Sequence, residues 1–172
     1  WTFAEIWETA AAQLPDAPFA KQGSRTVTWS EAERRAEGLA TFLLDRGAQR
    51  QDKVAQYLYN CPEYLESVFA CYKAALVPVN TNYRYAADEL VYLWDNADAV
   101  AVIFHGSFTE RCAHLRDRVP GVRTWIWVDD GSEPCPDWAI DYEVAAASAT
   151  GVGRVSAPWG RSPDDLYILY TG

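Results

Sequence analysis

The stretch Ala99-Val100-Ala101-Val102-Ile103-Phe104 is apolar at every position. A strand with one face in water alternates apolar and polar residues, whereas an unbroken apolar run is typical of a parallel strand covered by helices on both faces. This stretch therefore predicts an α/β fold built around a parallel sheet.

The segments on either side of this stretch repeat the alternation of strand and helix. Helical periodicity follows Ser30, Pro62, Ala86 and Ser107, and a weaker helical pattern covers 138–147. Short apolar strands are predicted at 54–59, 76–79, 124–128 and 166–170. Strands separated by helices of this length predict a doubly wound, mostly parallel sheet with helices on both faces.

Local signals predict where several of these helices begin and end. Ser30 with Glu33, and Ser107 with Glu110, have the capping-box spacing, in which each side chain satisfies a free backbone N–H at the other residue. Gly47 is the expected stop of the helix from Ser30, because glycine adopts the left-handed conformation at little cost. Pro78 cannot donate to a ladder and weakens the prediction of a strand at 76–79.

A helix and a hairpin are expected before the sheet. Residues 2–14 read as a helix with Phe3, Ile6, Trp7 and Ala10 on its buried face. Two extended runs, 19–22 and 26–29, flank Gly23-Ser24-Arg25 and predict a β-hairpin.

Composition excludes several classes of protein. The 172 residues are 49% hydrophobic and 23% charged, which is typical of an ordinary globular protein. A net charge of −9 without a dense basic stripe disfavours a nucleic-acid partner. Neither a spanning apolar run nor a signal peptide is recognisable, so a cytoplasmic location is expected.

The cysteines and histidines predict no metal site. The four cysteines form no C-x-x-C pair, and we expect free thiols at Cys61, Cys71, Cys112 and Cys135. His105 and His114 lack other ligand types at metal spacing and are expected to be structural or surface residues.

Several stretches, in order, resemble the N-terminal region of the adenylate-forming enzymes, the superfamily of acyl-CoA synthetases, luciferases and peptide-synthetase adenylation domains. They cover the chain from about Phe3 onward and are 26–31, 43–47, 52–55, 60–64, 77–80, 83–85, 89–90 and 165–172. Ala75 stands where the family often has glycine, which we attribute to packing. Gly172 stands where most members have serine, which, with twelve arginines against three lysines, resembles the actinobacterial synthetases of long-chain and steroid side-chain acids.

The resemblance implies the reaction of the whole protein. A carboxylate attacks the α-phosphate of MgATP and forms an acyl-adenylate, and the thiol of coenzyme A then displaces AMP. The resemblance also implies that 1–172 is the N-terminal part of the large AMP-binding domain. The absence of methionine and the stop at Gly172 suggest truncation at both ends, and we expect this part alone to be inactive.

Only the end of the chain matches a binding motif of the family. Asp165-Leu166-Tyr167-Ile168-Leu169-Tyr170-Thr171-Gly172 resembles the strand and opening of its phosphate-binding loop. The resemblance implies that Thr171 and Gly172 contact nucleotide phosphates and that Tyr170 aims them. No catalytic residue and no Mg²⁺ ligand of the family matches a position in this chain.

Other interpretations stay open. The chain could be a non-catalytic α/β module that binds a nucleotide or a partner, or an enzyme that uses a carrier-protein thiol as acceptor. A homodimer and a peripheral membrane contact are also left open for the whole protein.

Four further groups of residues read as structural. We expect Tyr83-Arg84-Tyr85 to pack a loop and Gly151-Val152-Gly153 to form a flexible loop. We expect Asp164-Asp165 to be solvated carboxylates, and the arginines 111, 116 and 118 to form a solvated helix face.

Overall fold

A computed structural model describes residues 1–148, 155, 157–165 and 167–170. A helix and a hairpin come first: α1 (Phe3–Gln13), β1 (Pro18–Gln22) and β2 (Arg25–Thr28). The sheet and its helices follow in the order α2 (Trp29–Asp45), β3 (Lys53–Tyr57), α3 (Pro62–Lys73), β4 (Val77–Asn80), α4 (Ala87–Asn96), β5 (Ala99–His105), η1 (Gly106–Phe108), α5 (Thr109–Leu115), η2 (Arg116–Arg118), β6 (Thr124–Val128), β7 (Ile140–Asp141), α6 (Tyr142–Ala146) and β8 (Ile168–Leu169).

The central sheet confirms the predicted α/β class. It has six strands in the order β7-β6-β5-β3-β4-β8, and every neighbouring pair is parallel. Pro78 fits inside β4 because the flanking N–H groups, of Val77 and Thr81, are the ones that face β3. The nitrogen of Pro78 faces the other side, where the described pairing with β8 joins Val79 to Ile168 and Asn80 to Leu169.

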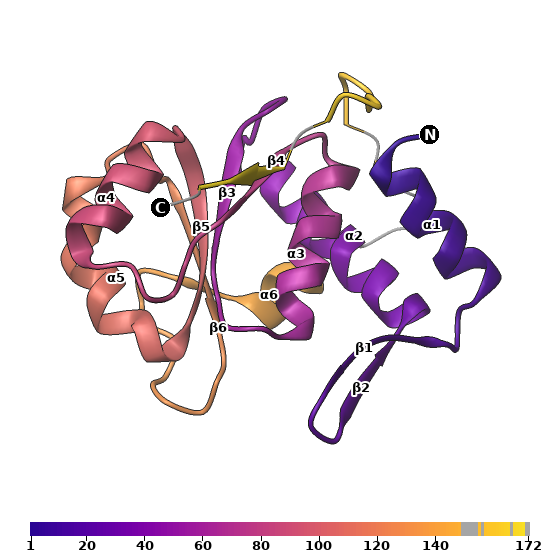
Figure 1. The fold of residues 1–172 in the computed structure, drawn as a ribbon, viewed down its shortest axis with the longest axis horizontal. Helices are drawn as coiled ribbons and strands as arrows, with labels where there is room; N and C mark the ends of the chain where they lie inside the picture. The colour runs from indigo at the N-terminus through magenta and orange to yellow at the C-terminus, as the bar shows by residue number, and fades with distance from the viewer. Residues whose placement is uncertain (149–154, 156, 166, 171–172) are drawn as a thin grey trace.

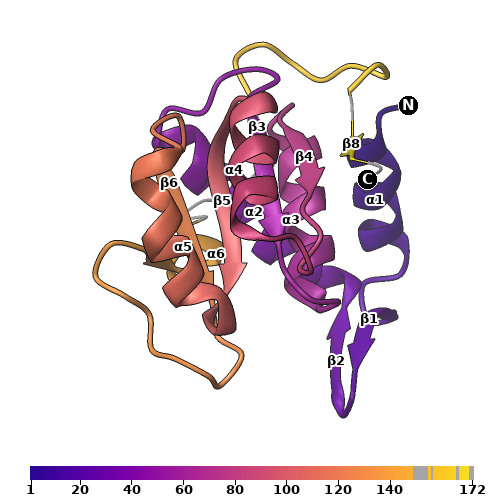
Figure 2. The ribbon, with the colours of Figure 1, turned by 60° about the vertical axis from the view of Figure 1, so that its left-hand side comes forward.

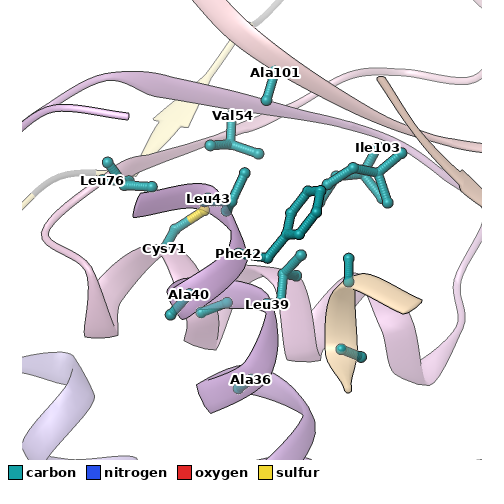
Figure 3. Close-up of a cluster of buried hydrophobic side chains, with 14 of the residues drawn as sticks. Ala36, Leu39, Ala40, Phe42, Leu43, Val54, Cys71, Leu76, Ala101 and Ile103 are labelled. Carbon is teal, nitrogen blue, oxygen red and sulfur yellow. The ribbon is translucent and has the colours of Figure 1, made fainter. Parts of the chain in front are cut away.

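Helices cover both faces of the sheet (Figure 1). The helices α2, α3 and α6 pack on one face around Leu39, Leu43 and Ile103, all at most 1% exposed. Figure 3 shows this cluster, in which α2 side chains meet those of β3 and β5. The helices α4 and α5 cover the other face around Trp94, Phe104 and other buried aromatic residues.

Two helix starts differ from the sequence prediction. The Thr28 side chain, not that of Ser30, caps α2 by accepting from the N–H of Glu31 at 3.2 Å. Ser107 lies inside the 3₁₀ turn η1, where its N–H donates to Asp130 Oδ2 at 3.0 Å, and its hydroxyl is not the cap of α5. Both differences arise because a capping-box spacing does not decide which of several hydroxyl or turn geometries the backbone adopts.

The weak helix predicted at 138–147 is confirmed only in its second half. It divides into β7 and the five-residue helix α6. Trp138 instead stacks on Phe104 at 5.5 Å between ring centroids, in the second core cluster.

The predicted helix α1 is confirmed, but its predicted buried face is only partly right, because Trp7 packs against the core while Phe3 and Ile6 do not lie buried. Phe3 and Ile6 are 50% and 48% exposed, whereas Ala4 and Glu8 are almost fully buried. Glu8 is buried because its carboxylate pairs with Lys73, 65 positions away in the sequence. Apolar periodicity could not reveal this face, since an ion pair decides it.

Several described turns use the left-handed conformation, and three of their residues, Gly47, Gln51 and Ala75, lie just before β3 or β4. Gly47 ends α2 with φ of 84°, as predicted. Ala75 has φ of 54°, so the glycine that the family often has there relates to backbone conformation and not, as expected, to packing alone. Gln51, with φ of 63°, donates its N–H to the carbonyl of Ala75 and joins these two turns.

Two buried ion networks hold the helical layers together. Lys73 on α3 donates to Glu8 of α1 and to Glu33 and Glu37 of α2, at 2.8 to 3.0 Å. Arg35 on α2 bridges α3 and α6. Because one-sided removal of a buried pair is costly, these contacts fix the α1, α2, α3 and α6 arrangement.

Candidate functional site

The carboxyl ends of the parallel strands lie at one edge of the sheet. In open parallel sheets, ligands bind beyond this edge. β8 is parallel to β4, so its end belongs to the same edge. Thr171 and Gly172, the predicted phosphate-binding residues, follow β8 but lie outside the described residues, and their role stays a prediction.

The predicted strand 166–170 is confirmed in part, with Ile168 and Leu169 paired to β4 and Leu166 outside the described residues. Hydroxyl contacts flank this pair. Tyr167 contacts Tyr64 of α3, with 2.6 Å between the hydroxyl oxygens, and Tyr170 donates to Asn96 Oδ1 at 2.7 Å. Tyr170 therefore holds the end of the strand, and its predicted role in aiming Thr171 and Gly172 stays a prediction.

The sheet changes direction between β3 and β5. From β3 the chain moves to β4 on one side, then returns to β5, β6 and β7 on the other. At this switch point, the Tyr59 N–H donates to His105 Nδ1 at 3.0 Å, and the two rings stack. Burial lowers the pKa of His105, and the bond to Nδ1 places the proton of the neutral ring on Nε2.

His105 is thus a buried structural histidine, as predicted. His114 is an exposed surface residue, also as predicted, and it lines an open cavity of about 520 Å³ beside the switch point. The polar members of the lining are Ser107, Glu110, Arg111 and His114. These residues come together because η1 and α5 start directly after β5.

Arg111 is not part of a purely solvated helix face, which corrects the expectation for this helix. Its guanidinium donates to the Tyr57 hydroxyl at 2.8 Å and to the Tyr85 carbonyl at 3.2 Å. Arg116 stacks on Trp138, whereas Arg118 pairs with exposed Asp88. Sequence periodicity placed these arginines on α5 and η2 but could not predict their partners on other elements.

A second cavity, of about 340 Å³, lies between the hairpin and the start of α3. Gln22 of β1 lines it and donates to the Asn60 carbonyl at 3.0 Å. Cys61 lines it, and burial raises the pKa of this thiol to about 12. A thiol with so high a pKa is a poor nucleophile at neutral pH. In Figure 2 the hairpin projects from the body on the side where β5 ends.

The remaining sequence candidates have mixed outcomes. Tyr83 packs against Tyr59 with tilted rings, 5.0 Å between centroids, as expected for loop packing. Asp165 is buried and accepts from the Ser162 N–H, so the expected solvation of that carboxylate is wrong, while Asp164 is exposed. Gly151-Val152-Gly153 lies outside the described residues.

The four cysteines are free thiols. Within the described ranges, no three His, Cys, Asp or Glu side chains gather as a cation site. Also within those ranges, no helix is long and apolar enough to cross a bilayer.

Comparison with known proteins identifies relatives of this fold. Residues 7–172 match the family described as AMP-binding enzyme. The medium-chain acyl-CoA ligase Mig of Mycobacterium avium is 33% identical over all of this chain, and the 3-oxocholest-4-en-26-oate–CoA ligase of Rhodococcus rhodochrous is 35% identical over 98% of it. A solved structure assigned as a long-chain-fatty-acid CoA ligase of Rhodopseudomonas palustris has a TM-score of 0.85 and 27% identity, over 99% of this chain and 42% of that one.

The chain spans about a third of the length of the two curated relatives, 33% and 30% respectively. These matches confirm the resemblance on which the sequence analysis relied.

Proposed function

Because the chain belongs to the AMP-binding enzyme family, we propose that the whole protein is an acyl-CoA ligase. It activates a carboxylic acid with ATP and transfers the acyl group to coenzyme A. We further propose that 1–172 forms the N-terminal part of the large nucleotide-binding domain, and that the residues completing the active site belong to other parts of the protein.

The observation that carries this proposal is the family match over 7–172. Relatives along the same length are named as CoA ligases of a medium-chain acid and of a steroid side-chain acid. We therefore propose an aliphatic or steroid side-chain acid as substrate, a role in lipid metabolism and a cytoplasmic location.

The reaction consists of two displacements. A carboxylate oxygen attacks the α-phosphorus of ATP, the bond to the pyrophosphate oxygen breaks, and acyl-adenylate and pyrophosphate form. The sulfur of coenzyme A then attacks the acyl carbon, loses its proton, and AMP leaves as the thioester forms. Catalysis of this kind rests on positioning and on stabilising charge at the phosphates.

In this scheme the residues after β8 hold the phosphates. The Thr171 hydroxyl donates to a phosphate oxygen, and Gly172 lets the backbone approach without a Cβ. Mg²⁺, when bound, neutralises phosphate charge. No described cluster of acidic residues fits it, so its ligands in our proposal lie elsewhere in the whole protein.

The test is acid-dependent pyrophosphate exchange by the purified full-length protein. Labelled pyrophosphate should enter ATP only when an acid is present, and a panel of short-chain, long-chain and steroid acids should rank the substrates. Pyrophosphate exchange that does not depend on an acid contradicts the proposal. So does a folded protein that shows no pyrophosphate exchange with any acid of the panel.

A further inference from the structure

The described backbone pairing of the strand β8 with the sheet is short. Among the residues that the structure describes, it consists of Val79↔Ile168 and Asn80↔Leu169, whereas strands in globular proteins usually extend over about five or six residues. Leu169 is 59% exposed, so burial of its side chain contributes little. Other contacts must fix the direction in which the chain leaves this strand.

A hydrogen-bond relay holds the start of β8 on one face of the sheet. Tyr64 of α3 donates its single hydroxyl proton to Asn80 Oδ1 at 3.0 Å. Its oxygen is therefore the acceptor for the Tyr167 hydroxyl at 2.6 Å. Asn80 also pairs with Leu169 through the backbone, so the relay closes a loop through β8, α3 and β4.

A separate bond holds the end of β8 on the opposite face. Tyr170 and Tyr167 are three positions apart, and side chains alternate along a strand, so the two rings lie on opposite faces. Tyr170 donates to Oδ1 of Asn96, the last residue of α4. Because α3 and α4 cover opposite faces of the sheet, hydrogen bonds hold β8 from both faces.

We propose that Tyr64, Asn80 and Asn96 are positioning residues, which fix β8 through Tyr167 and Tyr170 and so place the phosphate-binding turn that follows. This inference rests on the proposed function, because it assigns the turn at Thr171 and Gly172 to nucleotide phosphates. None of the three residues needs to touch the nucleotide.

The relay is suited to rigid positioning at ordinary pH. Burial, with a further contribution from the bond to Tyr167, raises the pKa of Tyr64, so its hydroxyl stays a donor. All five groups are uncharged side chains, so the contacts are insensitive to salt. A neutral hydrogen bond has a modest effect, equivalent to about fivefold in an equilibrium constant.

The test compares Tyr64→Phe, Tyr170→Phe and a matched Tyr92→Phe control in the full-length protein. Tyr92 lies on α4 and is 64% exposed. Two quantities are measured: hydrogen exchange of the peptide that contains 167–170, and kcat and KM in acid-dependent pyrophosphate exchange. We expect faster hydrogen exchange and an approximately fivefold loss of kcat/KM for ATP in the first two variants, with KM for the acid unchanged and Tyr92→Phe like the wild type.

The outcomes separate this inference from the proposed function. Unchanged hydrogen exchange in Tyr64→Phe and Tyr170→Phe overturns the inference, as does faster exchange with an unchanged ATP dependence. The inference is also overturned if kcat/KM falls equally for ATP and for the acid and Tyr92→Phe shows the same fall. If Tyr64→Phe does not fold, Tyr170→Phe decides alone, since it removes the bond on the other face. A wild-type protein without acid-dependent pyrophosphate exchange contradicts the proposed function itself, while hydrogen exchange still decides whether the hydroxyls hold β8.

Discussion

The replacement of Lys73 by methionine should strongly destabilise the protein at neutral pH. The Lys73 ammonium group is fully buried and donates to three carboxylates, Glu8, Glu33 and Glu37. Methionine fills similar space but, among the described residues, leaves Arg161 as the cation that donates to this group, through Glu8. Breaking a buried pair from one side costs about 3–5 kcal/mol.

The loss of stability caused by Lys73→Met should be smaller in acid. Burial alone would raise the pKa of Glu8, but hydrogen bonds from Arg161 and Lys73 hold it below its usual value. A carboxyl with a lowered folded pKa stabilises the fold above its unfolded pKa of about 4.3, and this stability is lost as the pH falls through the folded value. The variant lacks part of this pH-dependent stabilisation. The unfolding free energies of the two proteins should therefore converge below about pH 4.

Urea unfolding followed by tryptophan fluorescence measures both effects, at pH 7 and again at pH 3.5. Exposed Lys21 provides the matched control, and Lys21→Met should stay within about 0.5 kcal/mol of the wild type. A loss below about 1 kcal/mol for Lys73→Met at pH 7, or a loss that does not change with pH, would refute the reasoning.

Three other substitutions test separate features. Gly38→Ala places a Cβ 1.9 Å from the backbone oxygen of Ala146, so urea unfolding should show an unfolding free energy lower by about 2–3 kcal/mol, although alanine favours helix by about 1 kcal/mol. A higher unfolding free energy would contradict the close approach. Gly121→Ala, whose Cβ meets an ordinary contact at 3.7 Å, is the control. Gln51→Gly should raise the unfolding free energy by about 1 kcal/mol, because φ of 63° strains a residue with a Cβ; a loss in the same assay would count against that strain. Thr171→Ala in the full-length protein should raise KM for ATP severalfold without lowering the melting temperature, and unchanged ATP kinetics would remove Thr171 from the site.

Much of the fold could be predicted from the sequence, because parallel strands and their covering helices leave a strong hydrophobic pattern. The apolar run at 99–104 is the centre of β5, and Gly47 ends α2 as its conformational freedom predicts. Thr28 and Ser30 show the limit: both can cap a helix, and only the path of the preceding strand selects Thr28.

The parts that were missed depend on partners far apart in the chain. Nothing in the local sequence marks Glu8 as buried, because its partner Lys73 is 65 positions away. Arg111 was expected on a solvated face because its contacts with Tyr57 and Tyr85 come from other elements. The same holds for the candidate site. The motif before Thr171 could be found from local sequence, whereas the hydroxyl relay from Tyr167 to Asn80 needed the positions of three separate elements.

The products formed by the full-length protein test the central claim most directly. With ATP, coenzyme A and the acid that gives the fastest pyrophosphate exchange, we predict that AMP and acyl-CoA thioester accumulate one for one. ADP in place of AMP, or AMP without a thioester, would contradict an acyl-CoA ligase.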